Sequence, residues 1–404
     1  MLNSEAETPA QGSAGSSSHS RAGSMPTEKA SSSSVRTTSR TSTKQSQIQP
    51  RRPSLDRPTA IHGQSTLVPD VQVCYGISYD DALVSSPSVS IIWIFGGTDE
   101  SDSRDDVYTL DTETFVWGKP KPTGDLPFPS RAHTTTVVQN RYIFVVGGGQ
   151  DFVYYDTVHI FDTLTHKWMK PDIQGEKPMA RRAHTACLYN GRLFIFGGGN
   201  GSVALNDVWA MDVTVPFDKL RWEQIRPREG PLPPPRGYHT CNLVGNVMVI
   251  VGGSDGRDCY EDIWVMDLDT ALWKQVITDD KHQCMFHTST QVGSYLFILG
   301  GHNGQSFMSD LVLFNLVTLQ YETRQSAGRV FPARGYHAAV LADSRLIVTG
   351  GFDGDTVYED VSILDLAGLS YLPQVTRFGI IIDEQGVYVA DEGAEYGGEI
   401  VHIE

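Results

Sequence analysis

The chain has 404 residues, of which 40% are hydrophobic and 10% aromatic, enough for a large buried core. The formal net charge of −16 is uneven, because residues 1–60 hold 8 Lys or Arg against 4 Asp or Glu, and the remainder therefore carries −20. An acidic body argues against nucleic acid or an anionic membrane as the main partner.

The cysteines and the hydropathy indicate the compartment. The 5 cysteines are scattered and form no Cys-x-x-Cys pair, so they predict neither a disulfide framework nor a zinc site. No segment approaches the roughly 20 consecutive apolar residues of a membrane span, and the N-terminus does not resemble a signal peptide. We therefore expect a cytoplasmic protein, with the cell cortex as a further location, and no membrane span.

Residues 1–60 contain 15 Ser and 7 Thr and no Phe, Trp or Tyr. Such a segment cannot offset an ordering entropy of roughly 1–2 kcal/mol per residue, so a disordered tail is predicted. Within it, residues 21–26 resemble the Arg-x-x-Ser-x-Pro docking sequence of 14-3-3 proteins, with Ser24 as the phosphorylated residue. Ser54 follows two arginines, as in the sites of basophilic kinases. The alternative for both motifs is a chance match in a solvated leader.

Six apolar runs along the rest of the chain each end in a Gly-Gly pair, spaced 48 to 55 residues apart. The pairs are Gly96 and Gly97, Gly147 and Gly148, Gly197 and Gly198, Gly252 and Gly253, Gly300 and Gly301, and Gly350 and Gly351. A repeat of about 50 residues with one buried strand and a diglycine is typical of a propeller blade, whose faces are buried only when neighbours stack on them. We expect an all-β fold, a six-bladed propeller of four-stranded antiparallel blades over residues 61–372. A short acidic segment, residues 373–404, follows, and whether it completes the ring or hangs free stays open.

Each blade repeats the same order of four strands, a to d. Strand a opens with an arginine two or three residues before a histidine: Arg131 and His133, Arg182 and His184, Arg236 and His239, Arg334 and His337, and in blade 5 only His287. The apolar strand b, an Asn-Gly or Asp-Gly turn and an alternating strand c follow. Strand d carries a large ring that is expected to fill the widening gap between blades, namely Trp117, Trp168, Trp222, Trp273 or Tyr321. Blade 1 lacks the arginine and histidine, and its strand a is either residues 73–79 or begins at His62 with an insertion of about 20 residues.

The apolar run, the Gly-Gly pair, the Asp-Val-aromatic strand and the tryptophan together resemble the kelch repeat, over about 300 residues. The resemblance implies a propeller for protein interaction, as in cell-polarity scaffolds, Ras or Rab pathway regulators and substrate receptors of ubiquitin ligases. In kelch-like ligase adaptors, arginines about 16 residues before the diglycine line the mouth of the propeller and bind acidic peptides. The matching positions here are Arg131, Arg236, Arg334 and, in blade 3, Arg182 or Arg181, whereas Cys284 and Asp80 interrupt the series. We do not find the dimerisation domain of those adaptors in this sequence.

Two interpretations of the arginines stay open. Strand a begins on the side where the loops between strands b and c emerge, because the two strands are antiparallel. One interpretation is that each arginine pairs with a local carboxylate in a fixed bidentate geometry. The other is a mixed-charge docking face for a partner peptide, made of Arg131, Arg182, Arg236, Arg334, Asp255 and Asp353. The recurrent histidines are interpreted as hydrogen-bond partners between blades.

The predicted function is a non-catalytic scaffold that docks other proteins on the loop faces, in cell-polarity or small-GTPase signalling. A substrate receptor of a cullin-type ubiquitin ligase is the alternative. The third choice is an enzyme resembling galactose oxidase, a copper radical oxidase with kelch-type repeats that needs two Tyr, two His and a Tyr-Cys cross-link around copper. No residue pattern of this chain sets up that arrangement, so no catalytic residue, cofactor or metal is predicted.

Overall fold

The structure is a computed structural model that describes residues 72–77, 90–98, 102–323, 328–366, 375 and 378–390. All of them belong to Ser54–Glu404, the second of the two units into which the chain divides. Residues 1–60 lie outside this range, so the disordered tail, the 14-3-3 motif at Ser24 and the kinase site at Ser54 stay predictions. No helix in the described part of the chain is long and apolar enough to cross a membrane.

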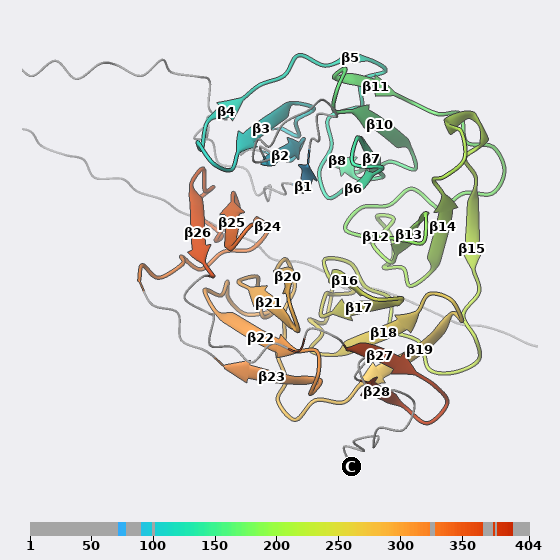
Figure 1. The fold of residues 1–404 in the computed structure, drawn as a ribbon, viewed down its shortest axis with the longest axis vertical. Coiled ribbons are helices and arrows are strands. Elements are labelled where there is room, and N and C mark those ends of the chain that lie inside the picture. Colours follow the sequence, from blue (N-terminus) through green and yellow to red (C-terminus); the bar gives the residue numbers. More distant parts are fainter. Residues whose placement is uncertain are drawn as a thin grey trace, which may run out of the picture. The chain divides into compact units, whose positions relative to one another are not determined.

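The described strands form six antiparallel blades in chain order around a ring (Figure 1). Blade 1 contains β1 (Gln72–Ile77), β2 (Ser90–Phe95), β3 (Val107–Asp111) and β4 (Trp117–Gly118). Blade 2 contains β6 (Thr134–Val138), β7 (Tyr142–Val146), β10 (Val158–Asp162) and β11 (Lys167–Met169), with β5 (Thr123–Gly124) parallel to β11 and the ribbon β8 (Gly149–Gln150) and β9 (Val153–Tyr154) in its b–c loop. Blade 3 contains β12 (Thr185–Tyr189), β13 (Arg192–Phe196), β14 (Val208–Asp212) and β15 (Trp222–Ile225), with the 3₁₀ turn η1 (Phe217–Lys219) between the last two.

Blades 4 to 6 repeat the plan. Blade 4 contains β16 (Thr240–Val244), β17 (Val247–Val251), β18 (Ile263–Asp267) and β19 (Leu272–Val276). Blade 5 contains β20 (Thr288–Val292), β21 (Tyr295–Leu299), β22 (Leu311–Asn315) and β23 (Gln320–Thr323). Among the described residues blade 6 contains β24 (Ala338–Ala342), β25 (Arg345–Thr349) and β26 (Val361–Asp365). The all-β, six-bladed propeller predicted from the Gly-Gly repeat is confirmed.

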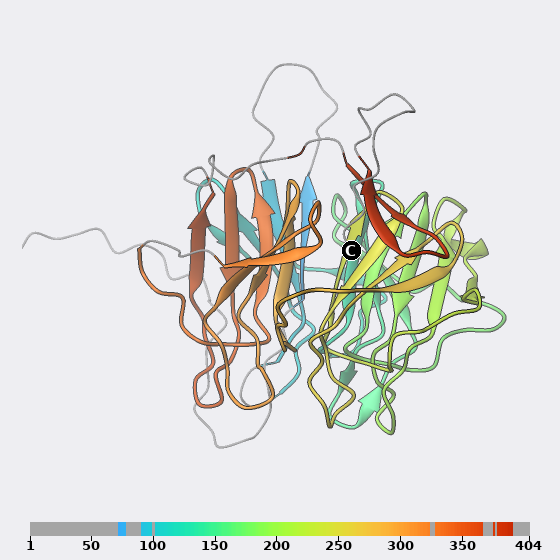
Figure 2. The same ribbon diagram turned by 90° about the horizontal axis from the view of Figure 1, so that it is seen from below.

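Strand a of every blade lies nearest the axis. β6 contacts β1 and β12, β16 contacts β12 and β20, and β24 contacts β20 and β1. In the side view of Figure 2 the strands run from one face of the ring to the other. Because neighbouring strands of a blade are antiparallel, the a–b and c–d turns share one face of the ring, and the b–c loops lie on the opposite face with the starts of the a strands.

Strand b forms the centre of each blade because it is covered on both sides. All five residues of β17 are buried, and so are all five of β21. Continuous apolar sequence is what a strand covered on both faces requires. The diglycine that follows needs its small residues for close approach: Gly197 has φ +66°, and a Cβ there would lie 2.7 Å from the carbonyl oxygen of Arg236 in the next blade.

The tryptophans of strand d lie between blades. Trp168 packs against Phe95 of blade 1, with ring centroids 5.5 Å apart, and Trp273 against Phe196 of blade 3, at 5.1 Å. Trp222 belongs to a buried cluster shared with blade 2. These three rings are almost completely buried, whereas Trp117 is only half-buried.

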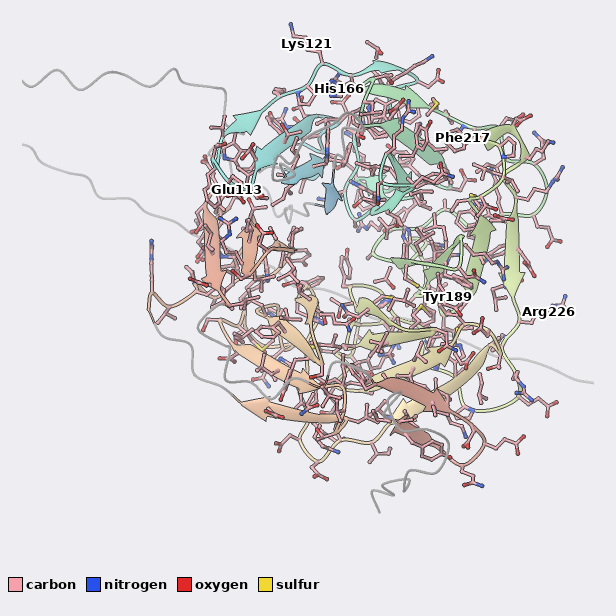
Figure 3. All side chains as sticks on the ribbon, viewed as in Figure 1. Glu113, Lys121, His166, Tyr189, Phe217 and Arg226 are labelled. Atoms are coloured by element: carbon pink, nitrogen blue, oxygen red, sulfur yellow. The ribbon has the colours of Figure 1, made fainter. Side chains whose placement is uncertain are left out.

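The ring closes by packing of blade 6 on blade 1. The first strand of blade 1 is β1, which overlaps residues 73–79 and pairs with β2, so the alternative start at His62 is wrong. Six buried side chains make the contact between blades 6 and 1, namely Ile92, Ile94, Leu110, Val340, Ala342 and Ile347. Arg345 of blade 6 also donates to Glu113 of blade 1 at 3.0 Å, and Figure 3 places Glu113 at this junction.

The C-terminal segment forms a hairpin on blades 4 and 5. Its strands are β27 (Gly379–Ile382) and β28 (Val387–Ala390), which contact β18 and β19 (Figures 1 and 2). Ile380 and Ile382 are buried in a cluster that includes Val249 of blade 4 and Phe314 of blade 5. Lys274 Nζ donates to the carbonyl of Glu384 at 2.9 Å. The described part of residues 373–404 therefore seals a gap between blades and adds no strand at the closure of the ring.

We expect Trp273→Ala to lower the free energy of unfolding by about 3–5 kcal/mol, because it empties a buried position between two blades. Chemical denaturation of the purified chain measures this loss. Trp117→Ala is the matched control and should cost clearly less, since that ring is half-buried. A loss of about 1 kcal/mol or less for Trp273→Ala would contradict the role of this ring as an inter-blade wedge.

Candidate functional site

The b–c loops and the starts of the a strands form one continuous face. Residues just before strand a make antiparallel bridges to the b–c loop of their own blade, as in Arg182 with Gly199, Gly237 with Ser254, and Gly335 with Phe352. The arginine-bearing segments and the acidic loops therefore lie on the same face of the ring. We call it the b–c face.

Three arginines on this side are buried and paired. Arg236 donates from Nη1 and Nη2 to the two carboxylate oxygens of Asp262, at 2.6 and 2.9 Å, and from Nη1 to the carbonyl of Gly252 at 2.8 Å. Its guanidinium also lies over the ring of Tyr260, 4.4 Å from the centroid. The same bidentate geometry joins Arg334 to Asp360 and Arg181 to Asp207. The three arginine side chains are at most 1% exposed.

The local-pairing interpretation therefore describes Arg236 and Arg334, and in blade 3 the buried arginine is Arg181 rather than Arg182. Each partner is the aspartate that precedes strand c, always 26 residues after the arginine. This constant separation of 26 residues is the signal in the sequence that identifies the pairs. Burial acts to raise the pKa of Asp207 and Asp360, but their arginines lower it, and the net change is a lowered pKa.

Asp255 and Asp353 do not pair with these arginines. The carboxylate of Asp255 accepts the backbone N–H groups of Arg257 and Asp258, both at 2.8 Å, and these hydrogen bonds lower its pKa. Asp353 likewise accepts the backbone N–H groups of two residues of its own loop, and also the hydroxyl of Tyr358 at 2.7 Å. Both aspartates therefore hold the shape of the b–c loops.

Arg131 and Arg182 are half-buried and occupy equivalent places, because each bridges to the glycine that follows its own diglycine. By its distance from the diglycine, Arg131 resembles the buried arginines of the other blades. The a–b turn of blade 2, however, has three residues, between Val138 and Tyr142, where blade 3 has two, and this extra residue lengthens the distance from Arg131 to its diglycine by one. Arg182 donates to the carbonyl of Asp151 at 3.2 Å and lies over the ring of Tyr154, 4.8 Å from its centroid. Unlike the three buried arginines, these two are partly exposed on the b–c face.

Four of the five strand-a histidines form the hydrogen bonds between blades that the sequence predicted. A threonine of strand a shares a hydrogen bond with the Nε2 of the histidine in the next blade, at 2.8 to 3.1 Å. The pairs are Thr134 with His184, Thr185 with His239, Thr240 with His287, and Thr288 with His337. Among the described residues no group of three or more His, Cys, Asp or Glu is arranged to hold a metal ion.

The mouth of the central channel on the b–c face has two unlike halves. The residue before each of five histidines has a positive φ, from 53° to 59°. In the last four of them the N–H donates to the carbonyl of the counterpart in the preceding blade, which makes a chain along the channel. The five residues are Ala132, Ala183, Tyr238, Phe286 and Tyr336. Left-handed backbone at bulky residues is uncommon and often marks ligand-binding regions. The channel encloses about 300 Å³.

Aromatic rings gather on the side of blades 4 to 6. Phe286 stacks on Tyr336, with centroids 3.9 Å apart, and meets Tyr238 edge-on at 4.5 Å. Phe307 and Phe352, from the b–c loops of blades 5 and 6, extend the group. We call these five rings the aromatic collar. The opposite side carries alanines at the channel and the exposed parts of the two half-buried arginines.

We expect Arg236→Met to lower the free energy of unfolding by about 3–5 kcal/mol, because it leaves the Asp262 carboxylate without its partner. The double variant R236M/D262N removes both charges, keeps a side-chain oxygen for the Nε1–H of Trp264, and should recover most of the loss. Chemical denaturation of the two variants beside the wild type measures the difference. A double variant that is no more stable than the single one would contradict this account.

Acid should destabilise the propeller through its histidines. Burial lowers the pKa of His133 to about 4 and that of His184, His287 and His337 to about 3, from an ordinary value of 6.5. Below pH 6.5 the unfolded chain binds protons that the folded chain does not, so each histidine costs about 1.4 kcal/mol of stability per pH unit until its folded pKa is reached.

Urea unfolding at fixed pH values between 7 and 4 should show this decline, with stability intact above pH 6.5. The control is His337→Gln, whose amide keeps a partner for Thr288 and does not titrate. It should lessen the slope, and an unchanged slope would show that other groups cause the acid sensitivity.

The sequence is similar to a protein-family model and to several known proteins. The chain matches the KLHDC2/KLHL20/DRC7 Kelch-repeats domain over residues 82–198, 154–351 and 255–377. It is 33% identical over 123 residues to Rab9 effector protein with kelch motifs of Gallus gallus, covering 30% of this chain and 33% of that protein. It is 30% identical over 177 residues to Kelch domain-containing protein 3 of Rattus norvegicus, covering 41% of this chain and 45% of that protein. The matches thus span less than half the length of these relatives.

Proposed function

The chain belongs to the kelch-repeat family of β-propellers, and from this premise we propose that it is a non-catalytic scaffold that docks partner proteins on the b–c face. The observation that carries the proposal is the divided mouth of the channel, with Arg131 and Arg182 on one side and the aromatic collar on the other. Arginine and large aromatic residues are the side chains that contribute most to binding at protein interfaces.

The two halves of the mouth suit different parts of one partner segment. Arg182 is already oriented by the ring of Tyr154 and by its bond to Asp151, so little side-chain entropy is lost when a carboxylate binds. The collar offers apolar surface on the other side of the mouth. The partner we propose is therefore a protein segment that carries both an acidic residue and an apolar one and that spans the mouth. The buried arginines keep the loops in place and do not touch the partner.

The histidines near the channel have structural roles. The histidines are held neutral by burial, and four of them share hydrogen bonds with threonines of the neighbouring blade. A general acid or base works best with a pKa near the operating pH, and these values are too low. Binding rather than catalysis is therefore the function that we assign to this face.

The biological setting that we propose is small-GTPase signalling or cell polarity in the cytoplasm or at the cell cortex. The chicken relative is named as a Rab9 effector, which is a property of that protein. The support for the present chain is its similarity to that relative over 30% of its length. Recovery of a cullin assembly with the protein would instead favour the substrate-receptor alternative.

Affinity purification of the full chain from its native cells, with quantitative mass spectrometry, tests the proposal. We expect R131S/R182S to reduce the recovery of specific partners by about tenfold, a loss of roughly 1.4 kcal/mol in binding. The matched control, K121S/R226S, removes two charges from the outer rim, where Figure 3 places Lys121 and Arg226, and should keep the partners. Loss in both variants, or in neither, would contradict docking at the mouth.

A further inference from the structure

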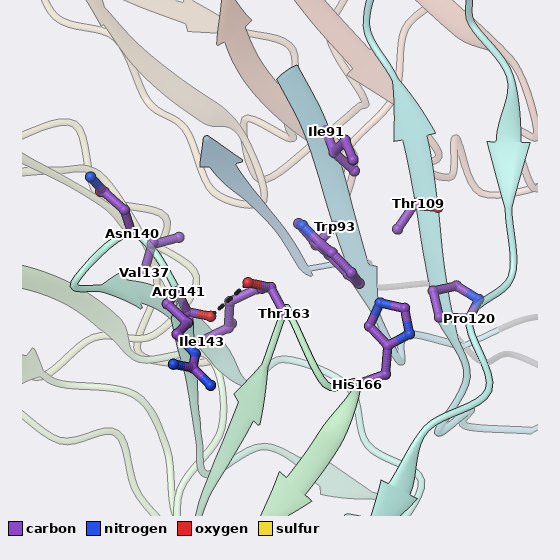
Figure 4. Close-up of a pocket in the computed structure, with 10 residues that line it drawn as sticks. All are labelled: Ile91, Trp93, Thr109, Pro120, Val137, Asn140, Arg141, Ile143, Thr163 and His166. Carbon is purple, nitrogen blue, oxygen red and sulfur yellow. Dashed lines mark hydrogen bonds between the residues drawn. The ribbon is translucent and has the colours of Figure 1, made fainter. Parts of the chain in front are cut away.

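A cavity of about 250 Å³ opens between blades 1 and 2, on the face that carries the a–b and c–d turns (Figure 4). Its walls are apolar and come from both blades, with Ile91 and Trp93 of β2 on one side and Val137 and Ile143 of blade 2 on the other. We call it the 1–2 pocket. It lies at the opposite face of the ring from the channel mouth, so it does not depend on the function proposed for the mouth.

Three of the corresponding gaps between other blades are filled by apolar side chains, whereas in the gaps between blades 3 and 4 and between blades 6 and 1 the residues that match Ile91 are Arg192 and Arg345. Equivalent positions in different blades are found by strand pairing. The residue of strand b that pairs with the last residue of strand c is Ile91 in blade 1 and Tyr142 in blade 2. In the gap between blades 2 and 3, Phe217 of η1 covers Tyr142 and Phe144, with centroids 5.0 and 5.9 Å apart. Figure 3 shows Phe217 at this junction. Phe144 is the counterpart of Trp93, so Phe217 occupies the place that is open between blades 1 and 2.

Two further gaps follow the same rule. Between blades 4 and 5, Ile380 and Ile382 of the C-terminal hairpin pack into a cluster with Val247 and Val249, the counterparts of Ile91 and Trp93. Between blades 5 and 6 the counterpart of Ile91 is Tyr295, whose own ring is 1% exposed. Large apolar side chains are therefore what these gaps accept, because the sheets splay apart with distance from the axis.

The rim of the 1–2 pocket is polar, and its arginine is paired with the carboxylate of Asp162. Its ten lining residues include Asn140, Arg141 and His166 and no carboxylate, on a propeller whose sequence is strongly acidic. Arg141 pairs with Asp162 through Nε at 2.9 Å and Nη2 at 2.7 Å, and this pair does not use the hydrogens of Nη1. Trp93 meets the ring of His166 edge-on at 5.7 Å, so the wall already presents aromatic edges and faces.

We propose that the 1–2 pocket binds an aromatic side chain of a partner protein with a carboxylate beside it. The ring takes the place that Phe217 takes one gap further on, against Trp93 and Ile143, and the carboxylate pairs with Nη1 of Arg141. The cavity has room for one ring rather than for a drug-sized ligand. Residues 1–60 contain no Phe, Trp or Tyr, but Tyr79 with Asp80 and Asp81 lies in this chain outside the described residues. Binding of a probe to the full chain, in which that segment is present, is therefore what assigns the pocket to a separate partner.

The test uses two small probes with one indole ring and opposite charge, indole-3-propionate and tryptamine. Ligand-observed saturation-transfer NMR with the full chain should give binding of the anionic probe and about tenfold weaker binding of the cationic one. Ile91→Tyr places in blade 1 the residue that blades 2 and 5 carry at this position, so it should fill the pocket and abolish probe binding. Its melting temperature should be equal to or above that of the wild type, since a cavity is filled.

A second variant tests the charge. R141Q/D162N removes both members of the ion pair, so no carboxylate is left without its partner, and the two probes should then bind equally. The proposal is overturned if neither probe binds the full chain, because the gap is then closed or filled by the protein itself. It is also overturned if Ile91→Tyr binds the anionic probe as the wild type does, or if that variant changes the oligomeric state in sedimentation, which would assign the pocket to a second copy.

Discussion

Contact between neighbouring blades is the interaction on which the whole propeller depends. A single blade exposes two apolar faces, and strand b is mostly apolar, in blades 4 and 5 along its entire length, so each sheet is stable only between two others. The gap between adjacent sheets widens away from the axis, and large rings such as Trp168, Trp222 and Trp273 occupy it. Closure then requires that the last blade meet the first, which it does through a cluster of six aliphatic side chains.

Polar contacts set the blades in register. The buried arginines join the start of strand a to the aspartate before strand c and to the carbonyl of the diglycine, so each fixes the b–c loop of its own blade. The threonine–histidine bonds do the same between blades, along the inner strands. Buried ion pairs contribute little net stability compared with apolar residues, but loss of one partner is costly, so these pairs favour one loop geometry over others. A rigid b–c face is the result.

Function in this architecture belongs to what departs from the repeat. The repeated residues are occupied with holding the ring together, including most of those that look chemical, such as the histidines and the arginines of blades 3, 4 and 6. In the function that we propose, the surface for partners is made where blades differ: alanine or an aromatic residue before the histidine, a half-buried arginine in blades 2 and 3, and the gap between blades 1 and 2. Loops and gaps can vary because the scaffold does not depend on them.

The sequence alone determined the six-bladed all-β fold, because the Gly-Gly period reflects a local need that recurs in every blade: a strand covered on both faces and a tight approach to the next blade. It also identified the histidines as inter-blade partners. It could not separate Arg181 from Arg182, or show that Arg131 corresponds to Arg182, since one extra residue in a turn shifts the spacing without changing the fold. Only the tertiary structure decided which arginines are buried against Asp207, Asp262 and Asp360, where the C-terminal hairpin packs and which gap stays open, because these depend on contacts between residues far apart in the chain.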